Sequence, residues 1–515
     1  MVILPENIIN RLKNRILPQW KICFFAALSV GFFAHFYKIT NWLPNWDSIV
    51  YREDPQHMEP LGRWLLFLAS GISSDYELPW LNGLLAVFYI SAAAVFICET
   101  LGVESRMSAL LIGAVTVTFP AVTSTLAYCY VADAYALSFL LACAAVYLLV
   151  CRKGLCEAAA AVVLTAVSTG IYQAYITVAI ALLTASLIIE SVFSGESAAH
   201  SVKRALKYAV CGIAAFALYY AVNAAVISLS GIGASDYQGI SDTLSFGKIS
   251  FFPALGSAFY SFYKFFISFP NGFNLYSAVN ILCFAVIAVG WGCAIIKNVR
   301  GALLPLIAFY IISVPVGCSA LYLANTGLDY HTLMKMSYFT VYIYLIMLCE
   351  RLAFKNGLLN AVKSWTVLLL GAAVVFGNIL TANIAYHKLV LSYERSYGIL
   401  IRISDRIEEL DAAGTAEKIL VVGALKNSED YSVNLPPEIT GATDGLILRR
   451  DDETVGQSVL TSALRDYCGI DLDFLSGSEA KELKSSESVR NMPCWPADGS
   501  VSLTDDTVIV KLSEN

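Results

Sequence analysis

Charged residues are scarce in this chain of 515 residues, where only 14% are Asp, Glu, Lys or Arg and 57% are hydrophobic. Soluble proteins carry roughly 25% charged residues, so this composition indicates an integral membrane protein. Basic clusters are lacking too, and the net charge of -6 argues against nucleic acid as a partner. The chain also has no Walker-type phosphate loop, nucleophile elbow or haem motif, which removes the commonest enzyme classes that depend on them.

Paired metal-ligand spacings are missing as well. Of the thirteen cysteines, eleven lie in or beside apolar runs, where free cysteine behaves as a small buried hydrophobe. His57, Asp54 and Glu59 form a possible set of metal ligands, but no second histidine stands nearby at ligand spacing. The sequence therefore predicts no metal site and no required cofactor, with a divalent metal at this set as the alternative. The other two cysteines, Cys468 and Cys494, are able to pair if their segment lies in an oxidising exterior.

Long apolar runs are what the chain has in abundance. They recur along its first three quarters, and as helices they are suited to crossing about 30 Å of hydrocarbon. We expect an all-α polytopic membrane body over residues 1–384, followed by a small α+β domain over 385–515. The body is predicted to hold eleven transmembrane helices, at 22–39, 79–98, 107–125, 130–151, 155–169, 171–193, 207–230, 276–296, 302–321, 337–354 and 364–384.

The distribution of Lys and Arg predicts the topology. With a helix break at residues 168–170, fifteen of these residues fall on one side of the membrane and six on the other. By the positive-inside rule the basic side, which includes the N-terminus, is cytoplasmic. An odd number of spans then places the C-terminal domain outside the cytoplasm.

The C-terminal domain is predicted to begin with a helix over 386–410. Apolar residues recur in it at spacings of three and four, namely at Leu400, Ile403, Ile407 and Leu410. Short strand-like runs follow at 418–423, 444–449 and 506–512.

The loop at 42–64, WLPNWDSIVYREDPQHMEPLGRW, is too rich in charge to lie in hydrocarbon. Under the predicted topology it faces outward. Asp47 lies about ten residues beyond the first span and is our candidate base, although acidic loop residues are often merely solvated. Trp46 beside it either seats a sugar ring or anchors the loop at the membrane interface.

A second candidate is Asp133, the one charged residue between Arg106 and Arg152. An isolated carboxylate in an apolar span marks a functional site by default. The alternative is an interfacial carboxylate that accepts hydrogen bonds from a neighbouring helix. Tyr172 and Gln173 open the sixth span at a similar depth and are weaker candidates for substrate binding.

An outward site with acid and base groups has no access to nucleotide donors, which are kept in the cytoplasm. A lipid-linked sugar is the natural substitute, because its phosphate sits at headgroup depth. Its transfer needs a carboxylate that accepts a proton and cations that hold the departing phosphate. The candidate cations are Arg63, Arg52, Lys335 and Lys264. Pairing with a nearby acid is the alternative role for Arg63, and snorkelling to the interface is the alternative for the lysines.

The stretches that carry a family resemblance are NWDSIVYRED running into LGRWLLFLA, then FPAVTSTLAYCYVADAYALSFLLA and STGIYQAYITVAI. They resemble the glucosyl transferase II family of bacterial membrane proteins, which modify O-antigen, within the polyprenol-phosphate-dependent GT-C glycosyltransferases. The resemblance covers the body to about residue 390, and the tail matches only in position and size.

This resemblance implies a GT-C-like fold in the bacterial inner membrane. It also implies transfer of a hexose, often glucose, from undecaprenyl phosphate to a surface polysaccharide such as O-antigen, with inversion. The essential acid of the class falls in the first outer loop, here on Asp47, with Asp54 as the second choice. Many members of the class carry a paired acidic motif, whereas this loop has a lone Asp47 and a separate Glu53–Asp54 pair, so the choice of base stays open.

Two other functions remain open. A carrier or flippase of lipid-linked sugars would also explain an acid within the membrane, but no inverted repeat is evident and simple translocation needs no large outer domain. A surface polysaccharide polymerase differs mainly in using lipid-linked chains as both donor and acceptor.

Overall fold

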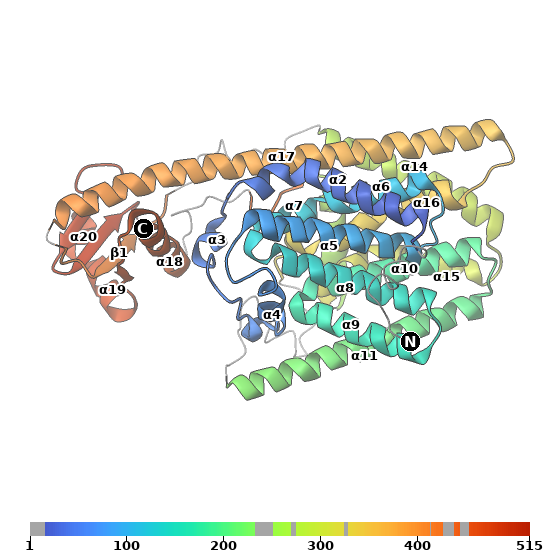
Figure 1. Ribbon diagram of the computed structural model, residues 1–515, viewed down its shortest axis with the longest axis horizontal. Coiled ribbons are helices and arrows are strands. Elements are labelled where there is room, and N and C mark those ends of the chain that lie inside the picture. Colours follow the sequence, from blue (N-terminus) through green and yellow to red (C-terminus); the bar gives the residue numbers. More distant parts are fainter. Residues whose placement is uncertain are drawn as a thin grey trace, which may run out of the picture.

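The computed structural model describes residues 16–231, 251–268, 274–323, 328–412, 414–425, 437–442 and 453–514. It shows a bundle of apolar helices and a small domain that contains a sheet, joined by one very long helix (Figure 1). The bundle helices are α2 (Pro18–Thr40), α5 (Pro79–Thr100), α6 (Arg106–Thr118), α7 (Pro120–Ala127), α8 (Ala132–Cys151), α9 (Leu155–Ile171), α10 (Ile176–Phe193), α11 (Ala198–Ser230), α13 (Phe251–Phe266), α14 (Leu275–Asn298), α15 (Leu303–Cys318), α16 (Thr340–Arg351) and α17 (Gly357–Leu410).

The predicted spans all overlap helices of this bundle. Within the described part of the chain, eight helices are long and apolar enough to cross a membrane, which is the architecture of a polytopic membrane protein. The helices α9, α15 and α16 are shorter than such a crossing requires by length alone. The count of eleven crossings therefore stays a prediction.

Local sequence explains several helix ends. Proline occupies the first turn of α2, α5 and α7, where its missing N–H costs nothing. Pro120 also separates α6 from α7, because the residue before proline is pushed out of the helical region. The break expected at 168–170 falls slightly later, at Tyr172, whose backbone is extended between α9 and the 3₁₀ turn η3 (Gln173–Tyr175).

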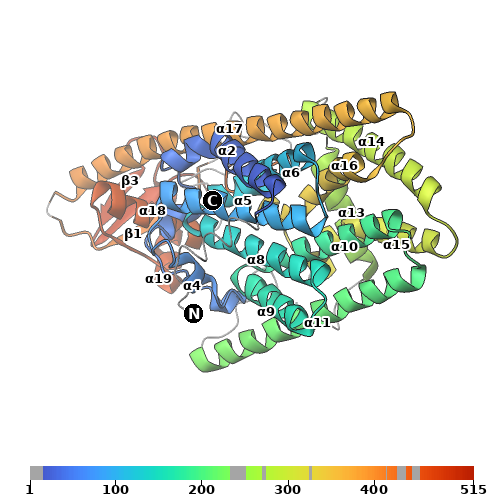
Figure 2. The same cartoon turned by 45° about the vertical axis from the view of Figure 1, so that its right-hand side comes forward.

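Neighbouring helices of the bundle are close in the chain in some pairs and distant in others. Thus α2 packs against α5 and α6, α5 against α8, and α8 against α9, while α10 packs against α15. The long helices α17 and α11 flank the bundle on opposite sides (Figures 1 and 2). Many of the buried contacts are made by alanine and other small residues, which allow the close helix packing typical of membrane bundles.

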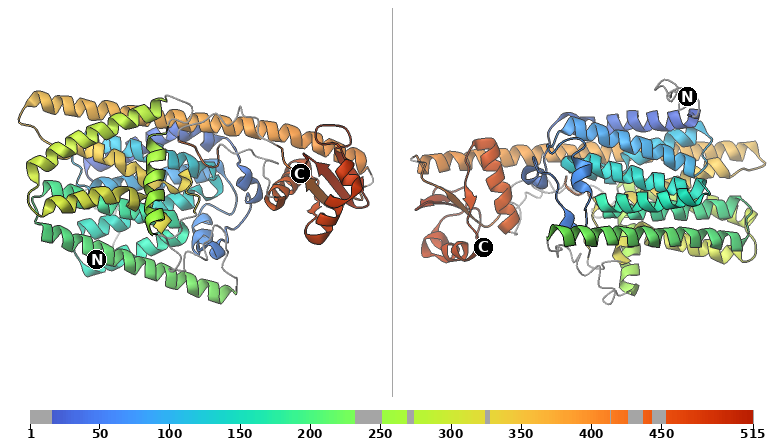
Figure 3. Two further views of the ribbon diagram at one scale, coloured as in Figure 1. Left: turned by 180° about the vertical axis from the view of Figure 1, so that it is seen from behind. Right: turned by 60° about the horizontal axis from the view of Figure 1, so that its bottom comes forward.

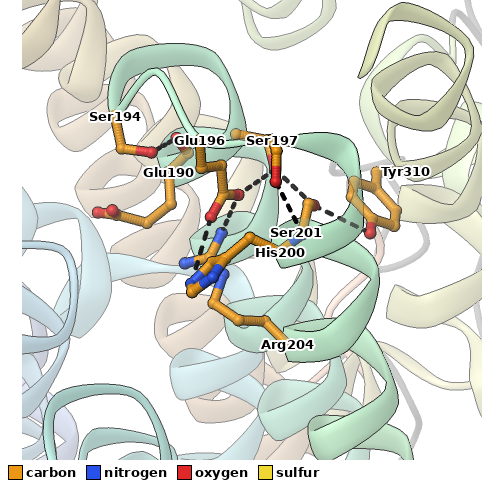
Figure 4. A network of polar contacts seen from close by, with 9 residues as sticks. Glu190, Ser194, Glu196, Ser197, His200, Ser201, Arg204 and Tyr310 are labelled. Atoms are coloured by element: carbon orange, nitrogen blue, oxygen red, sulfur yellow. Dashed lines mark hydrogen bonds and ion pairs between the residues drawn. The ribbon is translucent and has the colours of Figure 1, made fainter. Parts of the chain in front are cut away.

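A polar network ties α10, α11 and α15 together around the connection between α10 and α11 (Figure 4). Arg204 donates to the Glu196 carboxylate at 2.6 Å, and Ser191 donates to the same oxygen at 2.9 Å. The Ser201 hydroxyl lies 2.7 Å from that of Ser191 and 3.2 Å from that of Tyr310. Each of these five side chains thus has a polar partner, as buried polar groups require.

The C-terminal domain is a three-layer structure at the far end of α17 (Figure 3). Its sheet has the order β2-β1-β4-β3, with β1 parallel to both neighbours and β3 antiparallel to β4. The end of α17 and α18 (Glu453–Ala463) cover one face, and α19 (Gly477–Ser485) and α20 (Glu487–Asn491) cover the other. The strands are β1 (Lys418–Val422), β2 (Asp473–Phe474), β3 (Val501–Thr504) and β4 (Thr507–Lys511).

Most expectations for this domain are confirmed. The strands expected at 418–423 and 506–512 are β1 and β4, while 444–449 lies outside the described residues. The helix expected at 386–410 exists, but it is not a separate element, because α17 runs unbroken from the last predicted span for 54 residues. No loop separates the body from the domain at residue 384.

One detail of that domain differs from expectation, and one that the sequence left open is answered. Leu400, Ile403 and Ile407 are buried as the spacing predicts, but Leu410 is 45% exposed because the helix ends there. Cys468 and Cys494 are both free thiols. Cys468 packs against the core beneath α18, while the Cys494 sulfur lies 3.4 Å from the Glu514 carboxylate. The disulfide considered above is therefore not formed.

Candidate active site

The loop at 42–64 folds back onto the ends of the helices through two short helical turns, α3 (Trp46–Val50) and η1 (Glu59–Leu61). Gly62 follows η1 with a left-handed backbone, φ +76°, and a Cβ there would lie 2.5 Å from the Tyr219 hydroxyl. Glycine alone suits this conformation and this close approach. Gln173 donates to the Leu61 carbonyl at 2.6 Å and Tyr219 to the Gly62 carbonyl at 3.0 Å. Gln173 thus positions the loop.

The next residues dock on the break between α9 and η3. The Leu65 amide donates to the Gly170 carbonyl at 3.0 Å, and the Trp64 indole covers Gly170 so closely that a Cβ would lie 2.4 Å from its ring. This docking is possible only because residue 170 has no side chain. It brings Arg63 beside Tyr172.

Arg63 joins two stacked tyrosines. Its Nη1 donates to the Tyr135 hydroxyl at 2.9 Å, and its guanidinium carbon lies 5.3 Å from the Tyr172 ring centre. The two tyrosine rings stack at 4.0 Å with planes 10° apart. Tyr172 is 1% exposed, and its hydroxyl has no hydrogen-bond partner among the described residues. A guanidinium over the ring of a tyrosine whose buried hydroxyl is unsatisfied is suited to an oxygen-rich anion.

Asp47, which lies on α3, interacts with one of the same tyrosines, Tyr135. The Asn45 side chain caps this helix by accepting from the Ser48 amide at 2.8 Å. Asp47 is half-buried and interacts electrostatically with the hydroxyls of Tyr130 and Tyr135. The structure therefore gathers Asp47, Arg63 and Tyr172 around Tyr135.

Lys335 is connected with this group of tyrosines through Tyr330. Its ammonium nitrogen lies 5.7 Å from the Tyr330 ring and 5.9 Å from the Phe265 ring, and Tyr330 interacts electrostatically with Tyr172. Burial lowers the pKa of Lys335 to about 8. Lys335 is thus a cation beside Tyr330, and Tyr330 in turn interacts with Tyr172.

Charged neighbours also shift the pKa of Lys335. The exposed Lys264 on α13 lowers the pKa of Lys335 further, while Asp329 and Glu438 act in the opposite direction. Lys264 is therefore near Lys335, as a shared role in binding an anion requires.

Two other predicted residues contact the C-terminal domain. Arg52 Nη2 lies 3.2 Å from the Asp466 carboxylate and 3.7 Å from that of Glu53. Trp46 packs against the hydrophobic core that α18 covers. Their predicted role in substrate binding stays a prediction, since each side chain already has a protein partner.

Asp133 is completely buried at the start of α8. Its Oδ1 accepts from Asn82 on α5 at 3.0 Å, and Asn82 also donates to Ser73 at 2.8 Å. This is the hydrogen-bonded carboxylate that the alternative interpretation describes. A catalytic role for Asp133 stays a prediction.

The possible metal ligands of the loop are engaged with one another. His57 Nδ1 lies 2.9 Å from Glu59 Oε1, and the His57 ring stacks on Phe67 at 5.0 Å. Burial raises the pKa of Asp54, His57 lowers it and Asp75 raises it. Within the described ranges no group of three His, Cys, Asp or Glu side chains is arranged to hold a metal ion.

The structure adds Glu77 to the candidate residues. This carboxylate is only 6% exposed and accepts from Ser48, next to Asp47, at 3.4 Å. Burial raises the pKa of Glu77, and the buried Lys38 opposes that shift. One signal was available in the sequence, since Glu77 stands two residues before Pro79, where a span begins. Nothing in the sequence distinguished Tyr135 from the other tyrosines, because tyrosine is common in the predicted spans.

These observations define a polytopic membrane protein with a carboxylate, a guanidinium and buried tyrosines gathered at one end of its helices. The family described as Glucosyl transferase GtrII matches residues 36–350, which is more than half of the chain. The chain therefore belongs to this family of glucosyl transferases. The matched range includes Asp47, Arg63 and Tyr172 and stops before α17. The chain matches no curated protein and no solved structure.

Proposed function

We propose that this protein transfers a hexose, with glucose as the first choice, from undecaprenyl phosphate to a hydroxyl of a cell-surface polysaccharide such as O-antigen. The observation that carries the proposal is the gathering of Asp47, Arg63 and Tyr172 around Tyr135. Family membership supports the glucosyl group, and the polyprenyl phosphate donor and the polysaccharide acceptor are our inference.

In the proposed reaction the acceptor oxygen attacks the anomeric carbon of the hexose. A new carbon–oxygen bond forms there, and the bond between that carbon and the phosphate oxygen breaks. Asp47 accepts the proton of the acceptor hydroxyl, and the phosphate leaves as an anion that needs no proton. One displacement from the face opposite the phosphate inverts the anomeric centre.

The cations have separate tasks in this mechanism. Arg63 provides a planar set of donors for the phosphate oxygens, and the Tyr172 hydroxyl adds a donor that the described protein leaves unused. Lys335, beside the Tyr330 ring, and Lys264 near it contribute point charges. These groups stabilise the charge that grows on the phosphate as the bond breaks.

The proposed location is the outer face of a bacterial cell membrane. The count of Lys and Arg supports an outward position for residues 42–64, and the C-terminal domain lies at the same end of the bundle (Figure 1). A lipid-linked donor fits this position, because its phosphate lies at headgroup depth.

Two other activities compete with this proposal. A carrier of lipid-linked sugars would move the donor without breaking its phosphate bond, and membership in a glucosyl transferase family favours transfer over transport. A polymerase would require an acceptor chain that is itself lipid-linked.

The test is a transfer assay with purified protein in lipid nanodiscs. Undecaprenyl phosphate glucose, other undecaprenyl phosphate hexoses and uridine diphosphate glucose are each offered with a defined polysaccharide acceptor. We expect transfer from a polyprenyl donor alone, one free undecaprenyl phosphate per sugar transferred, and an inverted linkage by NMR. The proposal fails if no polyprenyl phosphate hexose donates a sugar.

A further inference from the structure

The helix that carries Asp47 shares a hydrophobic core with the C-terminal domain. Ile49 of α3 is 2% exposed and lies in one cluster with Leu400 of α17 and Leu460 of α18. Trp46 and Val50 pack against the same cluster. In Figures 1 and 3, α3 lies between the bundle and the domain. The apolar side of α3 is thus buried in a domain that begins more than 300 residues later in the chain.

Polar and aromatic contacts reinforce this junction. Arg52, which follows α3, forms its 3.2 Å ion pair with Asp466, whose side chain is only 13% exposed. The Arg52 guanidinium carbon lies 5.9 Å from the Trp42 ring. Trp42 in turn contacts Tyr393 of α17 and Tyr467, with ring centres 6.0 and 5.8 Å away. Both ends of the α3 segment are therefore attached to the domain.

A helix of five residues has no stability of its own, because helix nucleation is costly. The position of α3 depends on what it packs against. On the body side, Ser48 bonds to Glu77 and Asp47 interacts with Tyr130 and Tyr135. On the other side stands the core around Ile49.

We propose that the C-terminal domain is a positioning element of the active site, which holds α3 so that the Asp47 carboxylate stays in register with the Arg63–Tyr172 pair. This inference rests on the proposed function for Asp47. It assigns Ile49, Arg52 and Asp466 to positioning, although none of them needs to touch substrate. Removing their contacts should slow the chemical step more than it weakens donor binding.

The domain is also attached to the body at a second place, independent of α3. Ser124 donates to the Thr440 carbonyl at 2.7 Å, and the Thr332 amide donates to the Thr440 hydroxyl at 3.1 Å. Ile439 beside it is fully buried against Tyr386 and its neighbours. Because α17 also runs unbroken from the body into the domain, a variant that loosens α3 need not release the domain.

The first test compares two buried isoleucines, one in α3 and one in β4 of the C-terminal domain. Ile49 lies in the core shared with α3, whereas Ile509 is 1% exposed in the separate core on the other face of the sheet. We expect Ile49→Ala to lower kcat by about 10- to 100-fold, because a 1 Å misplacement costs roughly 100-fold in rate. Donor KM should change less than about twofold, since binding contacts are kept. Ile49→Val should give a smaller drop in the same direction.

Ile509→Ala and Ile509→Val are the matched controls. We expect kcat per folded molecule to remain at the wild-type value, even if the melting temperature falls. If the Ile509 variants lower kcat as much as the Ile49 variants do, general loss of domain stability explains both and the positioning role is excluded. If Ile49→Ala raises donor KM and leaves kcat unchanged, the inference is also wrong.

A charge exchange tests the ion pair. Asp466→Asn should lower kcat by about three- to tenfold, and exchanging the charges in Arg52→Asp with Asp466→Arg should restore at least half of the wild-type kcat, because a pair at 3.2 Å is rebuilt. If Arg52 instead binds the donor phosphate, the double variant remains impaired with a raised KM. That result would overturn the positioning role of Arg52.

An independent measurement uses no sugar donor. In an Asp47→Cys background, the rate at which a maleimide modifies the introduced thiol is followed by peptide mass spectrometry. Adding Ile49→Ala should raise this rate several-fold, because α3 leaves its position, and adding Ile509→Ala should not. Equal rates in both backgrounds contradict the positioning role. Because this result does not depend on transfer, it separates failure of this inference from failure of the proposed function.

Discussion

The guanidinium carbon of Arg63 lies 5.3 Å from the ring centre of Tyr172. One residue belongs to the charged loop before α5, and the other stands at the break between α9 and η3. Their contact depends on two glycines, one that turns the chain before Arg63 and one that admits the Trp64 ring. A cation is thereby held over the ring of a buried tyrosine in a chain with few charges.

Replacing Arg63 with lysine tests the need for a planar cation. Lysine keeps the charge but loses the fork of donors that reaches Tyr135, so we expect kcat/KM for the donor to fall about 10- to 100-fold, equivalent to a loss of roughly 1.5–3 kcal/mol. Arg402→Lys is the control, because Arg402 also lies over an aromatic ring, that of Trp495, in the C-terminal domain. Equal activity of Arg63→Lys and wild type would remove Arg63 from the phosphate site.

Removing the hydroxyl of Tyr172 tests whether it serves donor binding or the stability of the fold. Because it has no partner within the described protein, Tyr172→Phe should leave the melting temperature unchanged or slightly higher. Donor KM should rise roughly two- to tenfold, since a hydrogen bond to the ligand is worth about 0.5–1.5 kcal/mol. Thermal unfolding and donor titration measure the two effects. A lower melting temperature with unchanged KM would show that the hydroxyl serves the fold instead.

The close packing of Trp64 on Gly170 predicts that any side chain at residue 170 will clash with the indole. In Gly170→Ala the new Cβ would lie 2.4 Å from the indole, so the loop must shift, with a cost of about 1–3 kcal/mol in unfolding free energy and a loss of activity. Gly212→Ala in α11 is the control, because nothing lies within 4 Å of a Cβ there. Similar unfolding curves for the two variants would contradict the close packing of Trp64.

Lys335 gives the activity a dependence on pH. Its pKa of about 8 means that the side chain is charged below pH 8 and neutral above it. If it helps to hold the phosphate, donor KM should rise as the pH passes through about 8 and should stay low below that pH. Lys335→Arg should flatten the profile because arginine stays protonated throughout this range. A wild-type KM that is constant from about two pH units below this pKa to about two above it would exclude this role.

Sequence patterns predicted the helical body well because apolar length is a strong signal that tertiary context rarely overrides. They were weaker at the connection to the C-terminal domain. A change from apolar to polar composition near residue 384 marks where the helix leaves the apolar bundle, but it does not mark where the helix ends. The 54-residue α17 crosses this point because no proline or glycine cap interrupts it.

The candidate site was predictable only in part. Arg63 and Tyr172 were selected by their charge and depth, and the structure places them in contact. Gln173 was selected for the same reason, yet it bonds to the loop backbone, because spacing along a chain does not reveal which partner satisfies an amide. The buried Glu77 was missed because its partners Ser48 and Lys38 stand in other segments, and spacing along the chain does not reveal that the fold brings them together.

The measurement that tests the account most directly is the single-turnover rate of sugar transfer by Asp47→Asn. The amide is nearly the same size as the carboxylate but cannot accept the proton of the acceptor, so the rate should fall at least about 100-fold, the range expected for loss of a general base. Donor binding should remain, and Asp405→Asn on the exposed side of α17 should transfer at the wild-type rate. If Asp47→Asn transfers sugar as fast as wild type does, Asp47 is not the base, and the mechanism built around Tyr135 is wrong.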